Sequence, residues 1–175
     1  SNALAVIALG LKLGISKEII ARTLQTYKGA ARRLDVKWSR KGLTVIDDYA
    51  HHPTEIMATL EAARQLNPRR MIAVFQPHLY TRTRDLADDF ARSLDLLDRL
   101  VLLDIYPARE VPIPGVTSEM IFRKVRTSDK VMCSKENLME LLKRSDIEVL
   151  VTLGAGDIDR FTGPITRLIK ERIKE

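Results

Sequence analysis

The stretch Asp47–Glu55, with the sequence DDYAHHPTE, combines side chains that could carry out a reaction. Two of the three histidines of the chain and three of its carboxylates lie within it. It follows the apolar run Leu43–Ile46, which is typical of a buried strand. Imidazoles transfer protons near neutral pH, and carboxylates hold cations or orient an imidazole. The stretch therefore indicates a chemical site at the end of a strand.

A second stretch, Gln76–Asp85, brings the third histidine and two arginines after another apolar run, Met71–Phe75. The arginines, Arg82 and Arg84, could be no more than surface charges near the start of a helix. The helix dipole disfavours cations at that end, which weakens this structural interpretation. A guanidinium fork matches a carboxylate or a phosphate group, so the functional interpretation is a site for anionic reactants.

Polar residues follow two more apolar runs, in the segments Asp104–Glu110 and Gly154–Asp157. A structural interpretation exists for each group, with Asp48 and Thr54 as turn and cap residues and the glycines in a tight turn. Taken singly, the structural interpretation is the simpler one. Ligands on parallel α/β sheets bind beyond the carboxyl ends of the strands, so the convergence of these groups at strand ends favours a functional site.

Several kinds of site are disfavoured. His51 and His52 are adjacent and match no zinc spacing, so we expect no metal site among these residues. The only cysteine, Cys133, lies far in the sequence from every histidine and cannot form an internal disulfide, which fits a reducing cytoplasm. The sequence contains no G-x-x-x-x-G-K-[ST] phosphate loop. A protein that used ATP would need its main phosphate cradle upstream.

The composition favours a soluble globular protein. The chain has 175 residues, 45% of them apolar, and a net charge of +6. Its longest apolar stretch, Ala3–Leu11, contains a glycine and is too short to span a bilayer. The charge permits an anionic partner, but aromatic residues make up only 5%, which supplies few platforms for stacking bases. We expect neither a membrane nor a nucleic acid as a partner.

The beginning of the sequence suggests a piece of a longer protein. Ser1-Asn2-Ala3 resembles the remnant of a cleaved purification tag. Ala3–Leu13 and Ser16–Tyr27 are expected to be short helices, the second with Ser16 as N-cap. Two helices alone bury little apolar surface, so they look like the end of a preceding domain. The basic segment Lys28–Arg33 is expected to be a connector.

Alternating strands and helices are predicted after the connector. Residues 34–38 and 43–47 should form a hairpin, and further strands are expected at 71–75, 100–104, 130–133 and 149–153. Helices are expected at 54–66, 85–97, 118–125, 136–143 and 165–173. Strands separated by helices imply an α/β fold, with a mostly parallel sheet covered by helices on both faces.

Four motifs resemble the Mur ligase family, and they occur in the family's order. They are DDYAHHPTEI (Asp47–Ile56), FQPHLYTRTRDL (Phe75–Leu86), YPAREVPIPGV (Tyr106–Val116) and LGAGDI (Leu153–Ile158). The resemblance implies three domains: one that binds UDP, a central ATPase domain with the phosphate loop, and a Rossmann-like C-terminal domain. Residues 1–28 would then be the tail of the central domain, and residues 29–175 the C-terminal domain.

The resemblance also implies a reaction. Within the family, the motifs are similar to those of the members that join L-alanine to UDP-N-acetylmuramate in peptidoglycan synthesis. ATP, with Mg²⁺, converts the muramate carboxylate into an acyl phosphate, and the amine of alanine attacks it. The metal-binding carbamylated lysine of many members belongs to the central domain, and without the phosphate loop the chain alone should be inactive.

Roles for individual residues come from the same resemblance. Asp48 and His51 would be catalytic and, with Tyr49, would line the side of the site that faces ATP and the acyl phosphate. His78 and Arg82 would bind the incoming alanine. The remaining candidates are Arg33, which would reach the nucleotide from the connector, and Arg84, Asp104 and Asp157 as secondary candidates. Relatives often carry an arginine where this chain has Leu79, which leaves the number of contacts to the alanine carboxylate open.

Two alternatives remain open at the level of sequence. A recycling ligase of the same family, which attaches an intact tripeptide to UDP-N-acetylmuramate, shares the DD-x-AHHP pattern but matches FQPHLYTRTRDL less well. A protein of another class, a non-catalytic nucleotide-binding module, would have a native start near residue 1.

Overall fold

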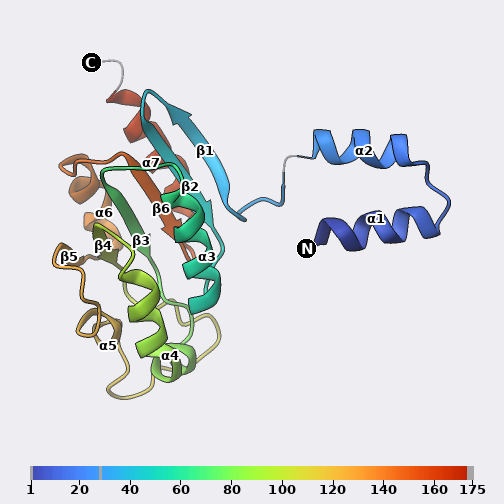
Figure 1. Cartoon of the computed structure of the whole chain (residues 1–175). Coiled ribbons are helices and arrows are strands. Elements are labelled where there is room, and N and C mark those ends of the chain that lie inside the picture. The colour runs from blue at the N-terminus through green and yellow to red at the C-terminus, as the bar shows by residue number, and fades with distance from the viewer. Residues whose placement is uncertain (1, 28, 173–175) are drawn as a thin grey trace. The chain divides into compact units, whose positions relative to one another are not determined.

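The computed structural model describes residues 2–27 and 29–172 (Figure 1). Contacts divide the chain into two compact units, residues 1–30 and 31–175. Lys28, the first residue of the expected connector, and Ile173, the end of the last expected helix, lie outside the described residues. No described helix has both the length and the apolar character needed to cross a membrane.

The first unit is a pair of helices, α1 (Asn2–Lys12) and α2 (Lys17–Thr26). Ser16 caps α2 as expected, because its Oγ accepts a hydrogen bond from the backbone N–H of Ile19 at 3.4 Å. The pair leaves large apolar side chains exposed, including Leu4 at 67% and Leu13 at 69%. Helices this short depend on packing against other elements for stability. The assignment of this unit to a preceding ATPase domain stays a prediction.

The second unit contains a six-stranded sheet with the order β1-β2-β6-β3-β4-β5. Only β1 runs antiparallel, in a hairpin with β2; all other neighbouring pairs are parallel. Every residue of β3 and β6, the two central strands, is buried, as continuous apolar runs in a parallel sheet require. The strands are β1 (Asp35–Arg40), β2 (Leu43–Asp48), β3 (Met71–Phe75), β4 (Arg99–Leu102), β5 (Lys130–Met132) and β6 (Val149–Leu153).

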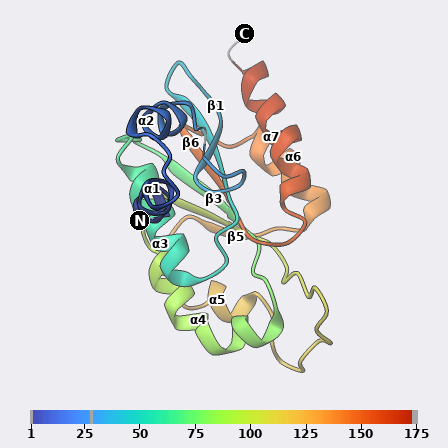
Figure 2. The ribbon, with the colours of Figure 1, turned by 90° about the vertical axis from the view of Figure 1, so that its right-hand side faces the viewer.

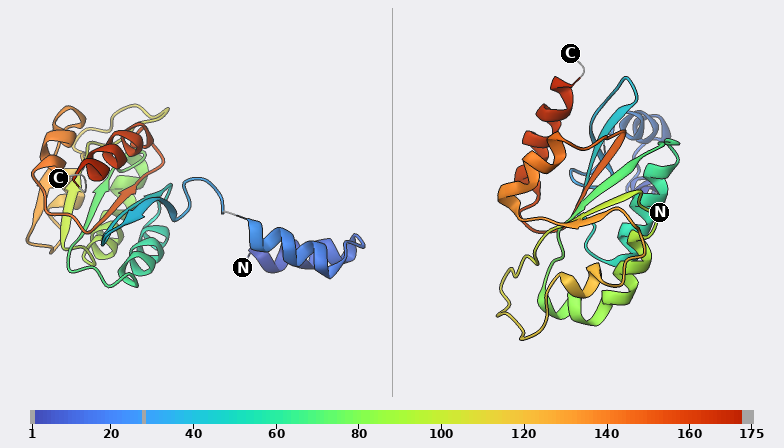
Figure 3. Two further views of the ribbon diagram at one scale, coloured as in Figure 1. Left: turned by 90° about the horizontal axis from the view of Figure 1, so that it is seen from above. Right: turned by 90° about the vertical axis from the view of Figure 1, so that its left-hand side faces the viewer.

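Helices cover both faces of this sheet (Figures 2 and 3). On one face, Met71, Ala73 and Phe75 of β3 pack with α3, α4 and α5. On the other, Ile72 and Val74 pack with α6 and α7. The alternation of β3 side chains between two cores confirms the expected Rossmann-like α/β fold. The helices are α3 (Pro53–Arg64), α4 (Tyr80–Leu94), α5 (Glu119–Phe122), α6 (Lys135–Lys143) and α7 (Asp159–Glu171).

Helices α4 and α7 begin at least five residues earlier than predicted. Helix α4 begins at Tyr80 rather than at residue 85, because Glu110, from a distant loop, accepts hydrogen bonds from the backbone N–H of Thr81 at 3.0 Å and from its hydroxyl. Helix α7 begins at Asp159 rather than at residue 165, just after Ile158, whose N–H donates to Oε1 of Gln76 at 3.1 Å. Both partners come from other segments, so local sequence does not reveal them.

Candidate functional site

The carboxyl ends of the parallel strands meet at one edge of the sheet. Asp48 at the end of β2 pairs in register with Leu153 of β6, and Leu153 pairs with Phe75 of β3. The stretches that follow these strands therefore emerge side by side. A parallel bridge between His78 and Tyr106 adds the segment after β4 to the same edge. The sheet brings together the four motifs that the sequence singled out.

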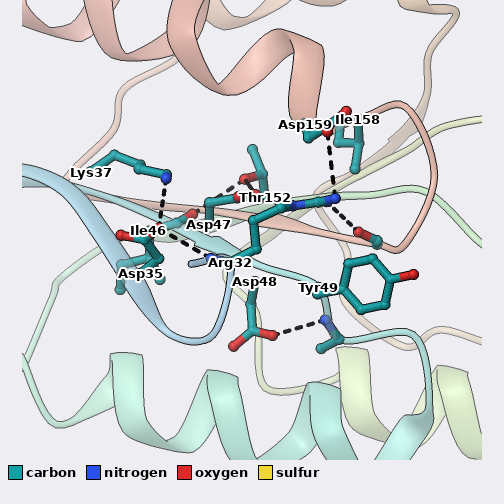
Figure 4. A network of polar contacts seen from close by, with 12 residues as sticks. Arg32, Asp35, Lys37, Ile46, Asp47, Asp48, Tyr49, Thr152, Ile158 and Asp159 are labelled. Carbon is teal, nitrogen blue, oxygen red and sulfur yellow. Dashed lines mark hydrogen bonds and ion pairs between the residues drawn. The ribbon is translucent and has the colours of Figure 1, made fainter. Parts of the chain in front are cut away.

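Arg32 belongs to the linker, which is residues 31–34 just before β1, and ties it to the ends of β2 and β6 (Figure 4). Its Nε lies 3.2 Å from Oδ2 of Asp47, whose side chain is 2% exposed, and its Nη2 donates to the carbonyl oxygen of Gly154 at 2.7 Å. Nη1 lies 3.6 Å from Oδ2 of Asp159. The guanidinium also lies 5.0 Å from the centroid of the Tyr49 ring, within cation–π range. Arg32 thus fixes the linker onto the sheet.

Asp48 is buried and accepts three hydrogen bonds. Its Oδ2 accepts from the backbone N–H of Leu34 at 2.7 Å and from the hydroxyl of Thr59 at 2.8 Å. Its Oδ1 accepts from the backbone N–H of Ala50 at 2.8 Å. These three hydrogen bonds hold the linker, the strand end and helix α3 together. In this arrangement Asp48 supports the loop that carries Tyr49 and His51.

His51 is partly exposed in that loop, directly before α3. Its Nδ1 lies 3.0 Å from the carbonyl oxygen of Tyr49 and 3.5 Å from Oε2 of Glu55. The ring of Tyr49 lies edge-on to it, with ring centroids 5.3 Å apart. His52 is the N-cap of α3, since its Nδ1 accepts a hydrogen bond from the backbone N–H of Thr54 at 3.4 Å. The two adjacent histidines therefore have different structural roles.

His78 and Arg82 lie against each other one helical turn apart. Nη1 of Arg82 is 3.3 Å from Nδ1 of His78. The His78 ring stacks on Tyr106, with centroids 5.8 Å apart and planes 24° apart, and lies 6.1 Å from the His51 ring. Burial, with the charges of Arg82 and His51, holds the pKa of His78 below its ordinary value of 6.5. This imidazole is therefore neutral at physiological pH.

The backbone just after His78 is held in an unusual conformation. Leu79 has φ 75° and ψ 137°, a combination that non-glycine residues rarely adopt. Its N–H donates to the carbonyl oxygen of Tyr106 at 3.0 Å, and the N–H of Tyr106 donates to the carbonyl oxygen of Pro77 at 2.8 Å. Strained backbone of this kind persists where the surroundings fix it, often at ligand sites.

A second ion pair borders the site near the β6 end. Nζ of Lys135 lies 2.6 Å from Oδ1 of Asp157, and Nε2 of Gln76 donates to the same oxygen at 2.8 Å. Lys135 also lies 5.8 Å from the centroid of the Tyr106 ring. Although burial acts to raise the pKa of Asp157, its hydrogen bonds with Lys135 and Gln76 hold it below the ordinary value. Asp157 is therefore ionised and paired.

The predicted residues divide into two groups. Asp48, Tyr49, His51, His78, Arg82 and Asp157 lie at one edge of the sheet. Arg33 is 62% exposed, with its guanidinium 3.7 Å from Glu55, and Arg84 pairs with its neighbour Asp85 on the surface. The side chain of Asp104 is exposed.

The sequence interpretation missed Arg32, Gln76, Tyr106 and Lys135. Gln76 and Tyr106 stand inside the recognised motifs and Arg32 stands next to the candidate Arg33 in the basic connector, and those positions were the available signal. Lys135 stands apart from all four motifs, and only the packing of α6 brings it to Asp157. Among the described residues, no group of three or more histidine, cysteine or carboxylate side chains could hold a metal ion. The described residues therefore do not by themselves form a Mg²⁺ site.

The fold and the site define an α/β domain with a cationic, imidazole-rich site beyond the carboxyl ends of a parallel sheet. Arginine, histidine and paired carboxylates at such an edge suit the binding of anionic reactants.

Comparison with known proteins identifies the family. The profile described as "Mur ligase, glutamate ligase domain" matches residues 32–156. The chain belongs to the Mur ligase family and corresponds to its C-terminal domain, which confirms the resemblance of the motifs.

Individual relatives share both the sequence and the fold. The chain is 47% identical to UDP-N-acetylmuramate--L-alanine ligase of Phocaeicola vulgatus over 98% of its length, and 43% identical to that of Parabacteroides distasonis over 99%. It spans 38% of the length of each. The crystal structure of UDP-N-acetylmuramate-alanine ligase from Thermotoga maritima has a TM-score of 0.76 and 28% identity, and the match covers 98% of this chain and 37% of that one.

Proposed function

We propose that this chain is the C-terminal domain of an ATP-dependent ligase that joins L-alanine to UDP-N-acetylmuramate through an acyl phosphate. The identity of 47% to a relative of that name, over almost the whole chain, is the observation that carries the proposal. The murein peptide ligase of Psychrobacter arcticus is similar only in fold, at 23% identity and a TM-score of 0.65 over 97% of this chain and 35% of that one. Sequence identity therefore favours alanine over a tripeptide as the amine substrate.

In this proposal, Arg82 pairs with the carboxylate of alanine, because a guanidinium offers two parallel donors to a carboxylate. Its position beside the neutral His78 leaves an imidazole next to the same carboxylate. Tyr49 borders the site beside His51, and its ring is held by Arg32. Arg33 has its guanidinium largely exposed, so it remains available for the nucleotide. Asp48 acts through the loop that it holds.

The other substrates and cofactors belong to parts of the protein beyond this chain. ATP would bind mainly to a central domain that carries the phosphate loop, and Mg²⁺ would be held there as well. The helices α1 and α2 would be the tail of that domain, which would cover their apolar side chains. The enzyme would act in the cytoplasm. Residues 1–175 alone would be inactive.

The test is phosphate release by the full-length protein with ATP, Mg²⁺ and UDP-N-acetylmuramate. L-Alanine is offered in one series and the stem tripeptide in another, with the variant Arg82→Ala alongside. We expect release that depends on alanine, and a loss of about 10²-fold or more in kcat/KM for alanine in the variant, since one charge-assisted contact supplies roughly 3 kcal/mol. Release only with the tripeptide would indicate the recycling ligase, and no release with either would overturn both.

A further inference from the structure

The hydrogen bonds of His51 determine which of its nitrogens carries the proton. Its Nδ1 lies 3.0 Å from the carbonyl oxygen of Tyr49 and 3.5 Å from Oε2 of Glu55. A carbonyl oxygen and an ionised carboxylate can only accept. Nδ1 must therefore be the donor, and in the neutral ring Nε2 keeps a free lone pair. His51 can take up a proton at Nε2.

The hydrogen bonds of His78 determine the opposite arrangement. Its Nδ1 lies 3.3 Å from Nη1 of Arg82, and a guanidinium can only donate. Nδ1 must therefore be the acceptor, and the proton of the neutral ring lies on Nε2. The stack on Tyr106, with planes 24° apart, fixes the orientation of this ring. His78 can donate a hydrogen bond but has no free lone pair for a proton.

The charges around the two rings reinforce the difference. Glu55 faces His51 and stabilises a positive imidazole. Burial acts to raise the pKa of Glu55, but the backbone N–H of His51 and the charges of His51 and Arg33 hold it below its ordinary value, so Glu55 is ionised. Arg82 faces His78 and opposes a positive charge there, while Glu110 offsets Arg82 only in part. The rings lie 6.1 Å apart, within reach of one small substrate.

We propose that His51 and His78 hold opposite tautomers and have different roles in amide formation. His51 accepts a proton, and His78 donates a hydrogen bond. This inference rests on the proposed function. The neutral amine of alanine attacks the carbonyl carbon of the acyl phosphate, and a C–N bond forms. The C–O bond to phosphate breaks, and its electron pair leaves with phosphate. One N–H proton goes to Nε2 of His51, while Nε2–H of His78 donates to an oxygen of the substrate.

Glu55 is a positioning residue in this scheme. Its Oε2 accepts the backbone N–H of His51 at 3.1 Å and lies close to Nδ1, so it fixes both the loop and the tautomer. It also stabilises the imidazolium that forms when His51 takes the proton. The guanidinium of Arg33, 3.7 Å from the other oxygen of Glu55, helps to hold this carboxylate in place.

The tautomers can be measured on residues 1–175 without any ligase activity. Long-range ¹H–¹⁵N correlation spectra of histidine-labelled protein distinguish the protonated ring nitrogen, and the chain has only three histidines to assign. Removing one histidine at a time, as His51→Gln, His52→Asn and His78→Gln, assigns the signals. We expect the proton of His51 on Nδ1 and that of His78 on Nε2 above pH 7.5. The same tautomer at both residues would overturn the inference.

A kinetic test separates failure of this inference from failure of the proposed function. Exchange between ADP and ATP in the presence of UDP-N-acetylmuramate reports acyl phosphate formation, which requires no amine. We expect His51→Gln to retain this exchange and to lose about 10²- to 10⁴-fold in kcat with alanine, as for loss of a general base. The control His52→Asn keeps a helix cap and should keep the full rate.

Each remaining outcome decides one question. Absence of exchange in the unaltered full-length protein would overturn the proposed function. Exchange together with a normal alanine rate in His51→Gln would overturn the assignment of His51. Glu55→Gln should lower kcat with alanine and leave the exchange between ADP and ATP unchanged, and the spectra should show less of the His51 tautomer that carries the proton on Nδ1, because the carboxylate beside Nδ1 is gone. A lower rate with an unchanged His51 tautomer would reduce Glu55 to a structural residue and overturn its assigned role.

Discussion

Gly156 lies directly against the ring of Tyr106. A Cβ added to Gly156 would come within 2.6 Å of Cγ and 2.7 Å of Cβ of Tyr106, closer than such atoms approach one another. Tyr106 in turn stacks on His78, a residue of the candidate site. The glycine of the GAGD segment is therefore required by the packing of the site, in addition to any role in a turn.

Gly156→Ala should destabilise the protein by about 1–3 kcal/mol, the usual cost of overpacking a filled space. The added methyl must displace Tyr106 or Oε1 of Gln76, which would lie 2.5 Å away. Urea unfolding measures the effect. The matched comparison is the same change in a Tyr106→Ala background, where it should cost less by at least about 0.5 kcal/mol. An equal cost in both backgrounds would show that the tyrosine ring is not the obstacle, because alanine keeps only the Cβ of this residue.

Arg32 lies mostly buried beside Asp47, whereas its neighbour Arg33 is largely exposed. Replacing each arginine by alanine should therefore change the free energy of unfolding by different amounts. Arg32→Ala leaves Asp47 buried without its cation, which should cost about 3 kcal/mol of unfolding free energy. Arg33→Ala removes an exposed side chain and should change stability by less than about 0.5 kcal/mol. In the full-length protein, Arg33→Ala should instead raise the KM for ATP. Similar losses of stability in the two variants would contradict this division.

Asp48→Asn should lower stability as well as any activity. An amide can replace only one of the two accepting oxygens, so at least one of the donors from Leu34, Ala50 and Thr59 loses its partner. Leaving a buried donor unsatisfied costs about 1–3 kcal/mol. The control Thr59→Val removes one donor and leaves the carboxylate intact, and it should cost about 1 kcal/mol. Thermal unfolding measures whether Asp48→Asn lowers stability more than Thr59→Val does. An Asp48→Asn variant as stable as the unaltered protein would show that these hydrogen bonds contribute little to stability.

Stability should fall with acidification in two stages. The pKa of His78 is lower in the folded state than its ordinary 6.5, because burial and Arg82 oppose its charge. As the pH falls, the unfolded chain therefore takes up a proton on His78 at a higher pH than the folded protein does. The free energy of unfolding that His78 contributes is fully present above about pH 6.5 and is lost as the pH falls below that value. Glu55 and Asp157 also have lowered pKa values, so the stability that Glu55 contributes is lost as the pH falls below about 4.5, and that of Asp157 as it falls below about 3.8. Unfolding followed against pH should show both stages, and His78→Gln should remove only the first.

The unit of residues 31–175 should fold without the helices α1 and α2. Within the described residues, both apolar cores of this unit consist of side chains from beyond residue 31. Removing residues 1–30 should therefore change its unfolding free energy by less than about 0.5 kcal/mol. The same removal should abolish binding of an apolar dye to the exposed leucines of α1. A large loss of stability would mean that the first unit contributes to the second.

Much of this architecture could be predicted from local sequence. The runs Met71–Phe75 and Val149–Leu153 were predicted as strands with the bounds that they have, because short runs that are apolar, apart from Thr152, suit the middle of a covered sheet. The starts of α4 and α7 could not be predicted, since Glu110 and Gln76 lie 29 and 82 residues from the groups they bind.

The sequence by itself determined that this protein has a mostly parallel α/β sheet with imidazoles, carboxylates and guanidiniums at the carboxyl ends of its strands. Hydrophobic periodicity is a local property, and the end of a strand follows from it. Only the tertiary structure decided what each side chain does there: that Arg32 holds the linker while Arg33 stays exposed, that Asp48 is enclosed by three donors, and that His51 and His78 bind partners of opposite kind. The reason is physical, because hydrogen bonds and burial depend on which segments meet, and segments far apart in the chain meet only after folding.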